Sequence, residues 1–455
     1  YYLLQQQGYS QEQLQRYREL TANYATDLKL AAVVIEDLVA AYFKQRNKYS
    51  DIYWNEVPYP EFMAKTEESF LAGSSQQELG SAWKAFLQVI SLSKRMVEVF
   101  QDFHTLVNDQ ARSANEVELT ALTRWNTFYL EFMEFVARLE WVTSSGDHQD
   151  YCFSLKYHAK EGWMFLSSPI NVGKITYDKL LATADAVVCT SATLTAMNAS
   201  VSARASEWVL GHTFLPAEKR FKAPMILPPV YAYEKNARVF IADDTVSLFS
   251  QNYVESTLTQ IFPLIHQLGG RALLLFSSKQ RFEIARELVI TEFTNSIPLF
   301  IQGMGNKLVE EYKRQKGGIL LGMESFAEGI DIPGDDLQFV FIDKIPDLRQ
   351  DLVIEARRQY FDQMFGDEFN DYYLSLRCRS LIQKIGRLLR TTNDRGTVIV
   401  TDPRIKNWKT RTWGNFTKQM SPYVLQRTDL KTAVARSAEF ILQKTPSEAE
   451  ASLHP

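Results

Sequence analysis

The stretch ILLGMESFAEGIDIPG, residues 319–334, joins a short apolar run to a loop that contains glycines and carboxylates. Its first residues are apolar without alternation, which is typical of a strand that helices cover on both faces. Further runs of this kind occur at residues 186–189, 238–241, 272–276, 299–301, 339–342 and 397–400. Between two of them, residues 279–293 place apolar side chains along one side of a helix. Short apolar strands alternating with amphipathic helices predict a parallel α/β sheet.

Polar or small residues directly follow most of these runs. In open parallel sheets, ligands bind at the carboxyl ends of the strands. The residues at these predicted ends include Ser191 and Thr193, Ser277 and Ser278, Gln302 and Gly303, and Glu324 and Ser325. We therefore expect the functional site along this edge of the sheet.

The strongest local signal is QKIGRLLR at residues 383–390. On a helix, Gln383, Arg387 and Arg390 would fall within about 60° of one another, with the leucines and isoleucines opposite. Gly386 lies beside this polar stripe, where the missing side chain lets another surface approach. Arginine suits polyphosphate because its planar fork stays charged and binds two oxygens at once. The alternative is an exposed amphipathic helix with solvated arginines.

Together, residues 321–334 and 383–390 resemble motifs V and VI of superfamily 2 helicases. TSATL at residues 190–194 resembles motif III, LLLFSS at 273–278 resembles motif IV, and FIDKIP at 341–346 is similar to the strand after motif V. The order and spacing resemble the DinG/XPD branch over roughly residues 150–410. The resemblance implies an α/β fold, a RecA-like parallel-sheet motor domain (the P-loop NTPase helicase fold), preceded by an all-helical arch-like domain.

The resemblance also implies a domain order. Residues 1–150 would form the helical arch-like insertion, since residues 28–42 and 82–106 show helical apolar spacing and no strand pattern competes there. Residues 151–225 would end the first RecA-like domain with motif III and a linker. Residues 226–445 would form the second RecA-like domain with motifs IV, V and VI, and residues 446–455 a flexible tail. The tryptophans of the helical region are expected in its core.

Residue roles follow from the resemblance. It makes Arg387 and Arg390, with Gln383, candidate catalytic residues at the ATP γ-phosphate, where arginine stabilises charge that develops during transfer. It assigns nucleotide binding and coupling to Gly329, Asp331, Glu328, Gly386, Ser191 and Thr193. Expected DNA contacts are Ser277, Ser278, Gln302, Gly303, Glu324, Ser325 and Arg404. Turn capping by Glu328 and Asp331, and helix capping by Thr193, are the alternatives.

Two motifs of the ATP site are missing from the sequence. Gly173 and Lys174 are followed by Ile175, so the P-loop pattern is absent, and no Asp-Glu-x-His box occurs. In the DinG/XPD branch both lie upstream of the helical insertion. Because the first residue is Tyr1, we expect a longer protein whose N-terminal RecA-like half binds ATP and Mg²⁺, and an isolated chain that is inactive. The three scattered cysteines predict no metal site and no iron–sulfur cluster within the chain.

Charge and hydropathy limit the possible partners. The net charge is −4, yet basic residues crowd positions 377–411 near Trp408 and Trp413, a composition that suits single-stranded DNA. Solvated surface charge is the alternative. No apolar run reaches about 18 residues, so we expect no membrane span and a cytoplasmic location. The predicted function is an ATP-dependent DNA helicase, with 5′ to 3′ movement implied by the resemblance. A non-catalytic DNA-binding or scaffolding protein and an RNA helicase are the alternatives.

Overall fold

The structure is a computed structural model. It describes residues 10–46, 50, 54–64, 77–109, 116–144, 146, 148–198, 201–220, 224–305, 307–330, 332, 334–348 and 351–443. The chain divides into two compact units, one of Tyr1–Asn171 with Gln350–Arg357 and one of Val172–Arg349 with Arg358–Pro455. Among the described residues, no helix is both long enough and apolar enough to cross a membrane.

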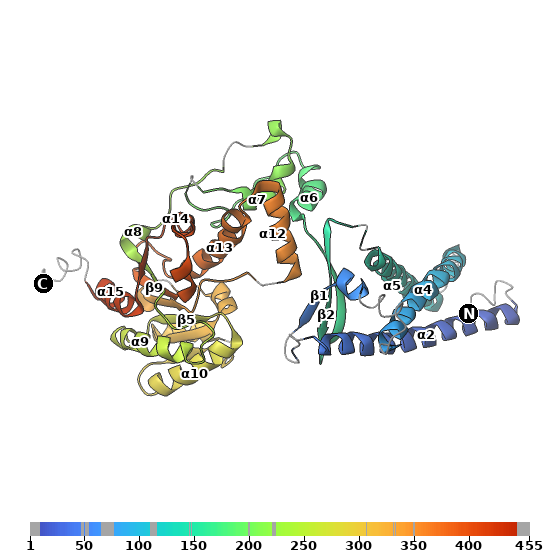
Figure 1. The fold of residues 1–455 in the computed structure, drawn as a ribbon, viewed down its shortest axis with the longest axis horizontal. Helices are drawn as coiled ribbons and strands as arrows, with labels where there is room; N and C mark the ends of the chain where they lie inside the picture. The colour runs from blue at the N-terminus through green and yellow to red at the C-terminus, as the bar shows by residue number, and fades with distance from the viewer. Residues whose placement is uncertain are drawn as a thin grey trace. The chain divides into compact units, whose positions relative to one another are not determined.

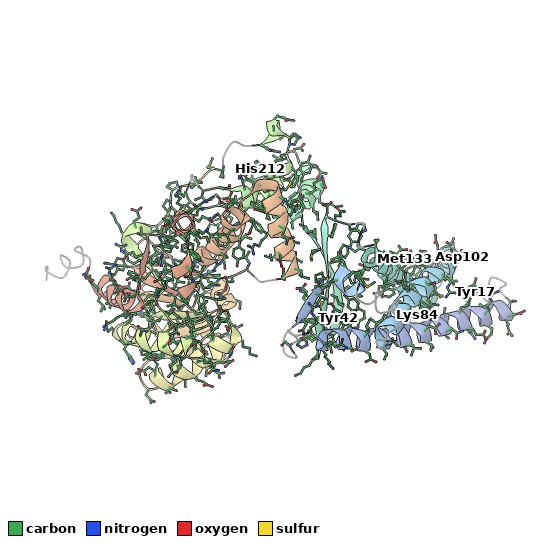
Figure 2. All side chains as sticks on the ribbon, viewed as in Figure 1. Tyr17, Tyr42, Lys84, Asp102, Met133 and His212 are labelled. Atoms are coloured by element: carbon green, nitrogen blue, oxygen red, sulfur yellow. The ribbon has the colours of Figure 1, made fainter. Side chains whose placement is uncertain are left out.

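The first unit combines long helices with a small antiparallel sheet (Figure 1). Its helices are α2 (Gln11–Lys44), α4 (Gln77–Asp109) and α5 (Glu116–Thr143), and its sheet has the order β1 (Asn55–Pro58), β2 (Tyr151–His158), β3 (Gly162–Pro169). The core between α2 and the sheet buries Phe43, Val57 and Leu155. Tyr42, labelled in Figure 2, packs edge to face on Phe62 near the end of α2.

The sheet changes the expected division of the chain. Residues 1–150 were predicted without strands, but Val57 of β1 pairs with Leu155 of β2. Because β2 and β3 form a hairpin on β1, residues 151–169 belong to the helical unit, and the break between the units falls after Asn171 rather than near residue 150. The signal was weak, since β1 is a four-residue strand that ends at a proline.

The second unit is built on a seven-stranded, wholly parallel sheet in the order β10-β4-β9-β8-β5-β7-β6. Its strands are β4 (Ala237–Ala242), β5 (Ala272–Phe276), β6 (Leu299–Ile301), β7 (Ile319–Met323), β8 (Phe339–Ile342), β9 (Gly396–Thr401) and β10 (Leu425–Thr428). Its longer helices are α9 (Tyr253–Gln267), α10 (Lys279–Phe293), α11 (Leu308–Gln315), the part of α12 (Leu352–Phe365) that follows Arg357, α13 (Leu374–Ile385), α14 (Thr410–Gln419) and α15 (Leu430–Leu442). Short helices are α6 (Val172–Thr176), α7 (Arg204–Val209) and α8 (Tyr233–Asn236).

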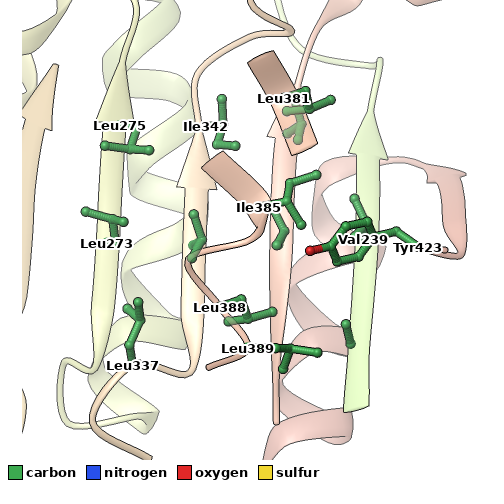
Figure 3. Packing of buried hydrophobic residues seen from close by; sticks show 14 of the residues in the cluster. Val239, Leu273, Leu275, Leu337, Ile342, Leu381, Ile385, Leu388, Leu389 and Tyr423 are labelled. Carbon is green, nitrogen blue, oxygen red and sulfur yellow. The ribbon is translucent and has the colours of Figure 1, made fainter. Parts of the chain in front are cut away.

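Helices cover both faces of this sheet. Residues of α9, α10 and α15 form one apolar cluster with the strands, and residues of α11, α13 and α14 form the other. Figure 3 shows Leu381 and Ile385 of α13 against the strands, with Leu388 and Leu389 continuing the contact beyond the helix. The motif VI segment is therefore anchored by its apolar side. The expected α/β, RecA-like fold class is confirmed.

Six of the seven predicted strands correspond to β4 through β9, and residues 279–293 are α10. The strand predicted at residues 186–189 is wrong: in the described structure these residues pair with no strand, and Val188 is 90% exposed. An apolar run becomes a strand only where a neighbouring strand bonds to its backbone. Conversely, β10 was missed because its sequence, LQRT, lacks an apolar run.

Candidate functional site

A buried carboxylate organises the carboxyl ends of β5 and β8. Asp343, directly after β8, accepts hydrogen bonds from the Ser277 backbone N–H (3.0 Å), Ser277 Oγ (2.9 Å) and Arg281 Nη1 (2.8 Å). Complete burial raises the pKa of Asp343 to about 6, although the bonds from Arg281 and Ser277 oppose this rise. Ser277 is thus tied to the sheet, and Ser278 caps α10 by accepting from the Arg281 N–H (3.3 Å). DNA contact by either serine stays a prediction.

The loop after β7 carries the motif V residues. A side chain at Gly322 would lie 2.4 Å from the Phe326 ring, which requires glycine there. Gln302 Oε1 accepts from the Met323 N–H (2.7 Å), and Glu324 pairs with Lys384 (3.3 Å). Both polar side chains are therefore engaged within the protein.

Other predicted residues of motif V, and of the strand end after β6, are described only in part. Ser325 and Gly303 are exposed, and Gly303 has a φ of +91°, where glycine is favoured. Asp331 lies outside the described residues, and for Glu328 and Gly329 only the backbone is described. Their coupling roles stay predictions.

The motif VI segment departs from the expected helix. Helix α13 ends at Ile385 with Gly386 as its C-cap, so Arg387 and Arg390 do not share a helical face with Gln383. The amides of Arg387 and Leu388 bond three residues back and tighten the last turn. The buried carboxylate of Asp394 then accepts a hydrogen bond from the Arg390 N–H (2.6 Å), which stabilises the turn that follows the helix. The stripe predicted from helical spacing is therefore wrong.

The side chains of Arg387 and Arg390 nevertheless meet at one backbone oxygen of motif V. Arg387 Nη1 donates to the Ile330 carbonyl at 3.0 Å, and Arg390 Nη2 donates to the same oxygen at 3.4 Å. Motif VI is thus joined to motif V at one acceptor. At Gly386 the nearest atom of another segment to an added side chain would be Tyr423 Oη, at 3.8 Å. That is an ordinary contact distance, so the expected close approach is not tight.

Motif III residues reach motif VI within the same unit. Gln383 Nε2 donates to Thr193 Oγ1 at 3.3 Å, and the Thr193 N–H donates to Ser191 Oγ at 3.2 Å. Ser191 and Thr193 therefore form a small turn beside α13. This contact supplies a physical link through which the two motifs can respond to one another.

A second link was missed by reasoning from the sequence. Arg379 Nη1 donates to Ser206 Oγ at 3.1 Å, and Ser206 Oγ donates to the carbonyl of Leu194 in the motif III segment. Burial lowers the pKa of Arg379, and its Nε and Nη2 have no hydrogen-bond partner among the described residues. Arg379 lies one helical turn before Gln383, a spacing that places both on one face of α13. From that spacing, Arg379 could have been predicted to lie beside Gln383.

Helix α7 holds this second link in place. Trp208 is almost fully buried against Phe361 and Tyr372, and Arg204 pairs with Asp371 at 3.6 Å. A side chain at Gly173 would lie 1.7 Å from the Trp208 carbonyl oxygen, so glycine is needed for this packing. Ser206 is consequently fixed on a well-packed helix.

Part of the predicted basic strip is occupied within the protein. Arg404 donates to Asp402 Oδ2 (2.6 Å) and Asp347 Oδ2 (2.7 Å), and Arg377 pairs with Asp347 Oδ1 (3.0 Å). Burial alone would raise the pKa of Asp347, but the bond from Lys344 and the two arginines lower it. This geometry favours a structural role for Arg404, and DNA binding there stays a prediction. Lys406 and Lys409 are exposed.

Metal ligands do not gather in the described part of the chain. There, no group of three or more His, Cys, Asp or Glu side chains could hold a metal ion. The cysteines are free, with Cys378 buried and Cys189 exposed.

Comparison with known proteins identifies the class. Residues 261–423 match the family described as helicase C-terminal domain. The protein named 3'-5' exonuclease DinG from Bacillus subtilis is 29% identical over 257 residues, 54% of this chain and 27% of that protein. ATP-dependent helicase DinG from Mycobacterium tuberculosis is 31% identical, over 58% of this chain and 38% of that protein. ATP-dependent DNA helicase DinG from Photobacterium profundum is 28% identical, over 69% and 46%.

The fold and these matches define a RecA-like helicase C-terminal domain. More narrowly, the chain is similar to helicases named DinG, as its resemblance to the DinG/XPD branch of superfamily 2 predicts. It spans between about a quarter and a half of the length of these relatives.

Proposed function

We propose that the chain is the second motor half of an ATP-dependent DNA helicase that moves on single-stranded DNA and unwinds duplex. The observation that supports this most is the meeting of Arg387 and Arg390 with the motif V carbonyl of Ile330. Both arginines donate to the same carbonyl oxygen of the motif V loop. Phosphate binding at motif VI would therefore change the position of a loop that is expected to contact DNA. The link from Gln383 to Thr193 adds motif III to the same chain of contacts.

ATP and Mg²⁺ are proposed to be held mainly by a first RecA-like half that contains the P-loop. This chain supplies arginines but no phosphate cradle, since neither the P-loop pattern nor an Asp-Glu-x-His box occurs in it. The exposed apolar segment at residues 186–189 supports the proposal, because such a run would be covered by joining the sheet of that half.

In this arrangement the arginines act on charge. As the γ-phosphoryl group transfers, negative charge grows on its oxygens, and Arg387 and Arg390 would stabilise it by charge-assisted hydrogen bonds. To reach the phosphate, each guanidinium would exchange its bond to Ile330 for one to the nucleotide. Loss of the bonds to Ile330 would free the motif V loop and change its contacts with DNA. Movement from 5′ to 3′ rests on the DinG resemblance alone, and a cytoplasmic location stays a prediction.

Binding to nucleic acid gives a direct test with the chain as it is. We expect residues 1–455 to bind a fluorescent deoxythymidine oligonucleotide roughly 20-fold more weakly at 200 mM than at 50 mM salt, as for about three phosphate contacts. Replacing both Lys406 and Lys409 by alanine should lower the slope of log affinity against log salt by about 1.4. The control variant Lys235→Ala, on the short helix α8, should leave the slope unchanged.

Binding without salt dependence would contradict the electrostatic part of the proposal. A strong preference for an RNA strand of the same length would favour the RNA helicase alternative.

A further inference from the structure

The loop between β4 and α9, residues 243–252, presents an unusual apolar tip. Phe249 is 96% exposed, the largest exposed fraction among the large apolar side chains in the described part of the chain. Single exposed apolar residues are common on surfaces, so exposure alone assigns no role. Phe249 differs from other exposed apolar residues in two respects. Its loop is anchored by hydrogen bonds, and the loop lies at the carboxyl ends of the strands.

The loop is anchored to the end of β5. Arg281 Nη2 donates to the Leu248 carbonyl at 2.6 Å, while Nη1 of the same guanidinium donates to Asp343 at 2.8 Å. At the loop's end, the Tyr253 hydroxyl donates to the Asp343 carbonyl. The backbone beside Phe249 is therefore fixed next to Ser277, the residue that follows β5. A ligand that met Phe249 would not have to order this loop first.

The acidic residues of the loop face other partners. Asp243 is paired with Arg427 (2.6 Å), and Asp244 Oδ1 accepts from the Leu430 N–H at the start of α15 (2.8 Å). Their charges are thus compensated by residues from the end of the chain. The tip is left apolar, without a carboxylate that would repel phosphate from it.

Other loops at the carboxyl ends of the strands carry similar side chains. Met304, after β6, is 59% exposed, and Val246 in the Phe249 loop is 40% exposed. Lys279 at the start of α10 and Lys307 before α11 are also exposed. Exposed apolar side chains and exposed lysines in these loops suit a nucleic-acid strand, whose bases stack and whose phosphates are negative.

We infer that Phe249 stacks on a base of single-stranded nucleic acid that crosses the carboxyl ends of the strands beside Ser277. This site deepens the proposed function and rests on its claim that the chain binds single-stranded DNA. The base takes the exposed face of the ring, and the phosphates on either side lie toward the lysines. Any base fits, because every base has a flat face, so the contact carries no sequence preference.

The test measures affinity of residues 1–455 for a deoxythymidine oligonucleotide and for an abasic strand of the same length. Phe249→Ala is expected to weaken binding of the deoxythymidine strand about tenfold, within the range for loss of one stacked base. The slope against salt should not change, since no charge is removed. On the abasic strand the substitution should have no effect, and Phe249→Trp should keep full affinity. The matched control is Leu442→Ala, which removes another exposed apolar side chain.

The outcomes separate the two proposals. If the unchanged chain binds the deoxythymidine strand and Phe249→Ala binds it equally well, the stacking contact is overturned while DNA binding stands. An equal loss on the abasic strand also overturns it, because the ring would then act without a base. If the unchanged chain binds neither strand, the proposed function fails at its DNA-binding step, and the stacking site fails with it.

Discussion

Replacing Arg387 or Arg390 by alanine in a protein that joins this chain to the proposed ATP-holding half should lower DNA-stimulated ATP turnover by about 10³-fold. That figure is the lower end for loss of an arginine that stabilises phosphoryl transfer. Nucleotide binding should fall much less, because the P-loop half supplies the main phosphate cradle and the arginines act chiefly on the transition state. Lysine at either position should restore turnover only in part, since a point charge cannot form the bidentate fork.

The control for this prediction is Arg436→Ala, because Arg436 is an exposed residue of α15, outside the basic strip, that donates to Gln426. It should change stability by no more than about 0.5 kcal/mol and leave turnover intact. ATP turnover and melting temperature are measured together for each variant. Near-normal turnover in a folded double variant of Arg387 and Arg390 would remove their catalytic role and leave only the structural bonds to Ile330.

The largest expected effect on stability belongs to Asp343. Asp343→Ala removes the partner of Arg281, whose side chain is only 16% exposed, and leaves the Ser277 N–H without its acceptor. Breaking a buried ion pair from one side costs about 3–5 kcal/mol, because the remaining charge stays buried. Urea unfolding should show this loss, whereas Ser277→Ala, which removes a hydroxyl but keeps the ion pair, should cost only about 1 kcal/mol. A loss below 1 kcal/mol for Asp343→Ala would contradict the assigned network.

The same residue gives a pH dependence with a definite sign. Burial raises the pKa of Asp343 from 3.8 to about 6, so between these values the folded protein binds the proton more tightly than the unfolded chain. The contribution of this group to folding is therefore complete below about pH 4 and is lost as the pH rises through about 6. Asp343→Asn, which cannot ionise, should lack this decline. Parallel stability curves for the two proteins between pH 4 and 7 would show that Asp343 keeps an ordinary pKa.

Much of the second unit could be predicted from the sequence, because its strands are local and strongly apolar. Each of β4 through β9 contains a run of consecutive apolar residues, most of them buried, which is a signal that needs no knowledge of distant residues. Strand β10 is polar and exists because β4 pairs with its backbone, and residues 186–189 stay unpaired although they are apolar. Whether each of these two segments is a strand depends on whether a neighbouring strand pairs with it, and the sequence of one segment does not identify that neighbour.

The geometry of the candidate site was likewise only partly predictable from the sequence. The residue types of motif VI were predicted, but their geometry followed from Gly386 ending α13 and from Asp394 capping the next turn. The link from Arg379 to Ser206 joins residues 173 positions apart, so the local sequence indicates that Arg379 shares a helix face with Gln383 but does not indicate its partner. For Arg404, counting basic residues predicted a phosphate contact, whereas the tertiary structure surrounds it with carboxylates.

The central claim is that this chain supplies the arginines but not the phosphate cradle of a two-part motor. Its most direct test measures ATP turnover with and without single-stranded DNA for residues 1–455 alone and for the same residues joined to the proposed P-loop-containing RecA-like half. We predict DNA-stimulated turnover only in the joined protein, lost when the P-loop lysine is replaced. DNA-stimulated turnover by a contaminant-free preparation of residues 1–455 alone, or its absence from the folded joined protein, would contradict the claim.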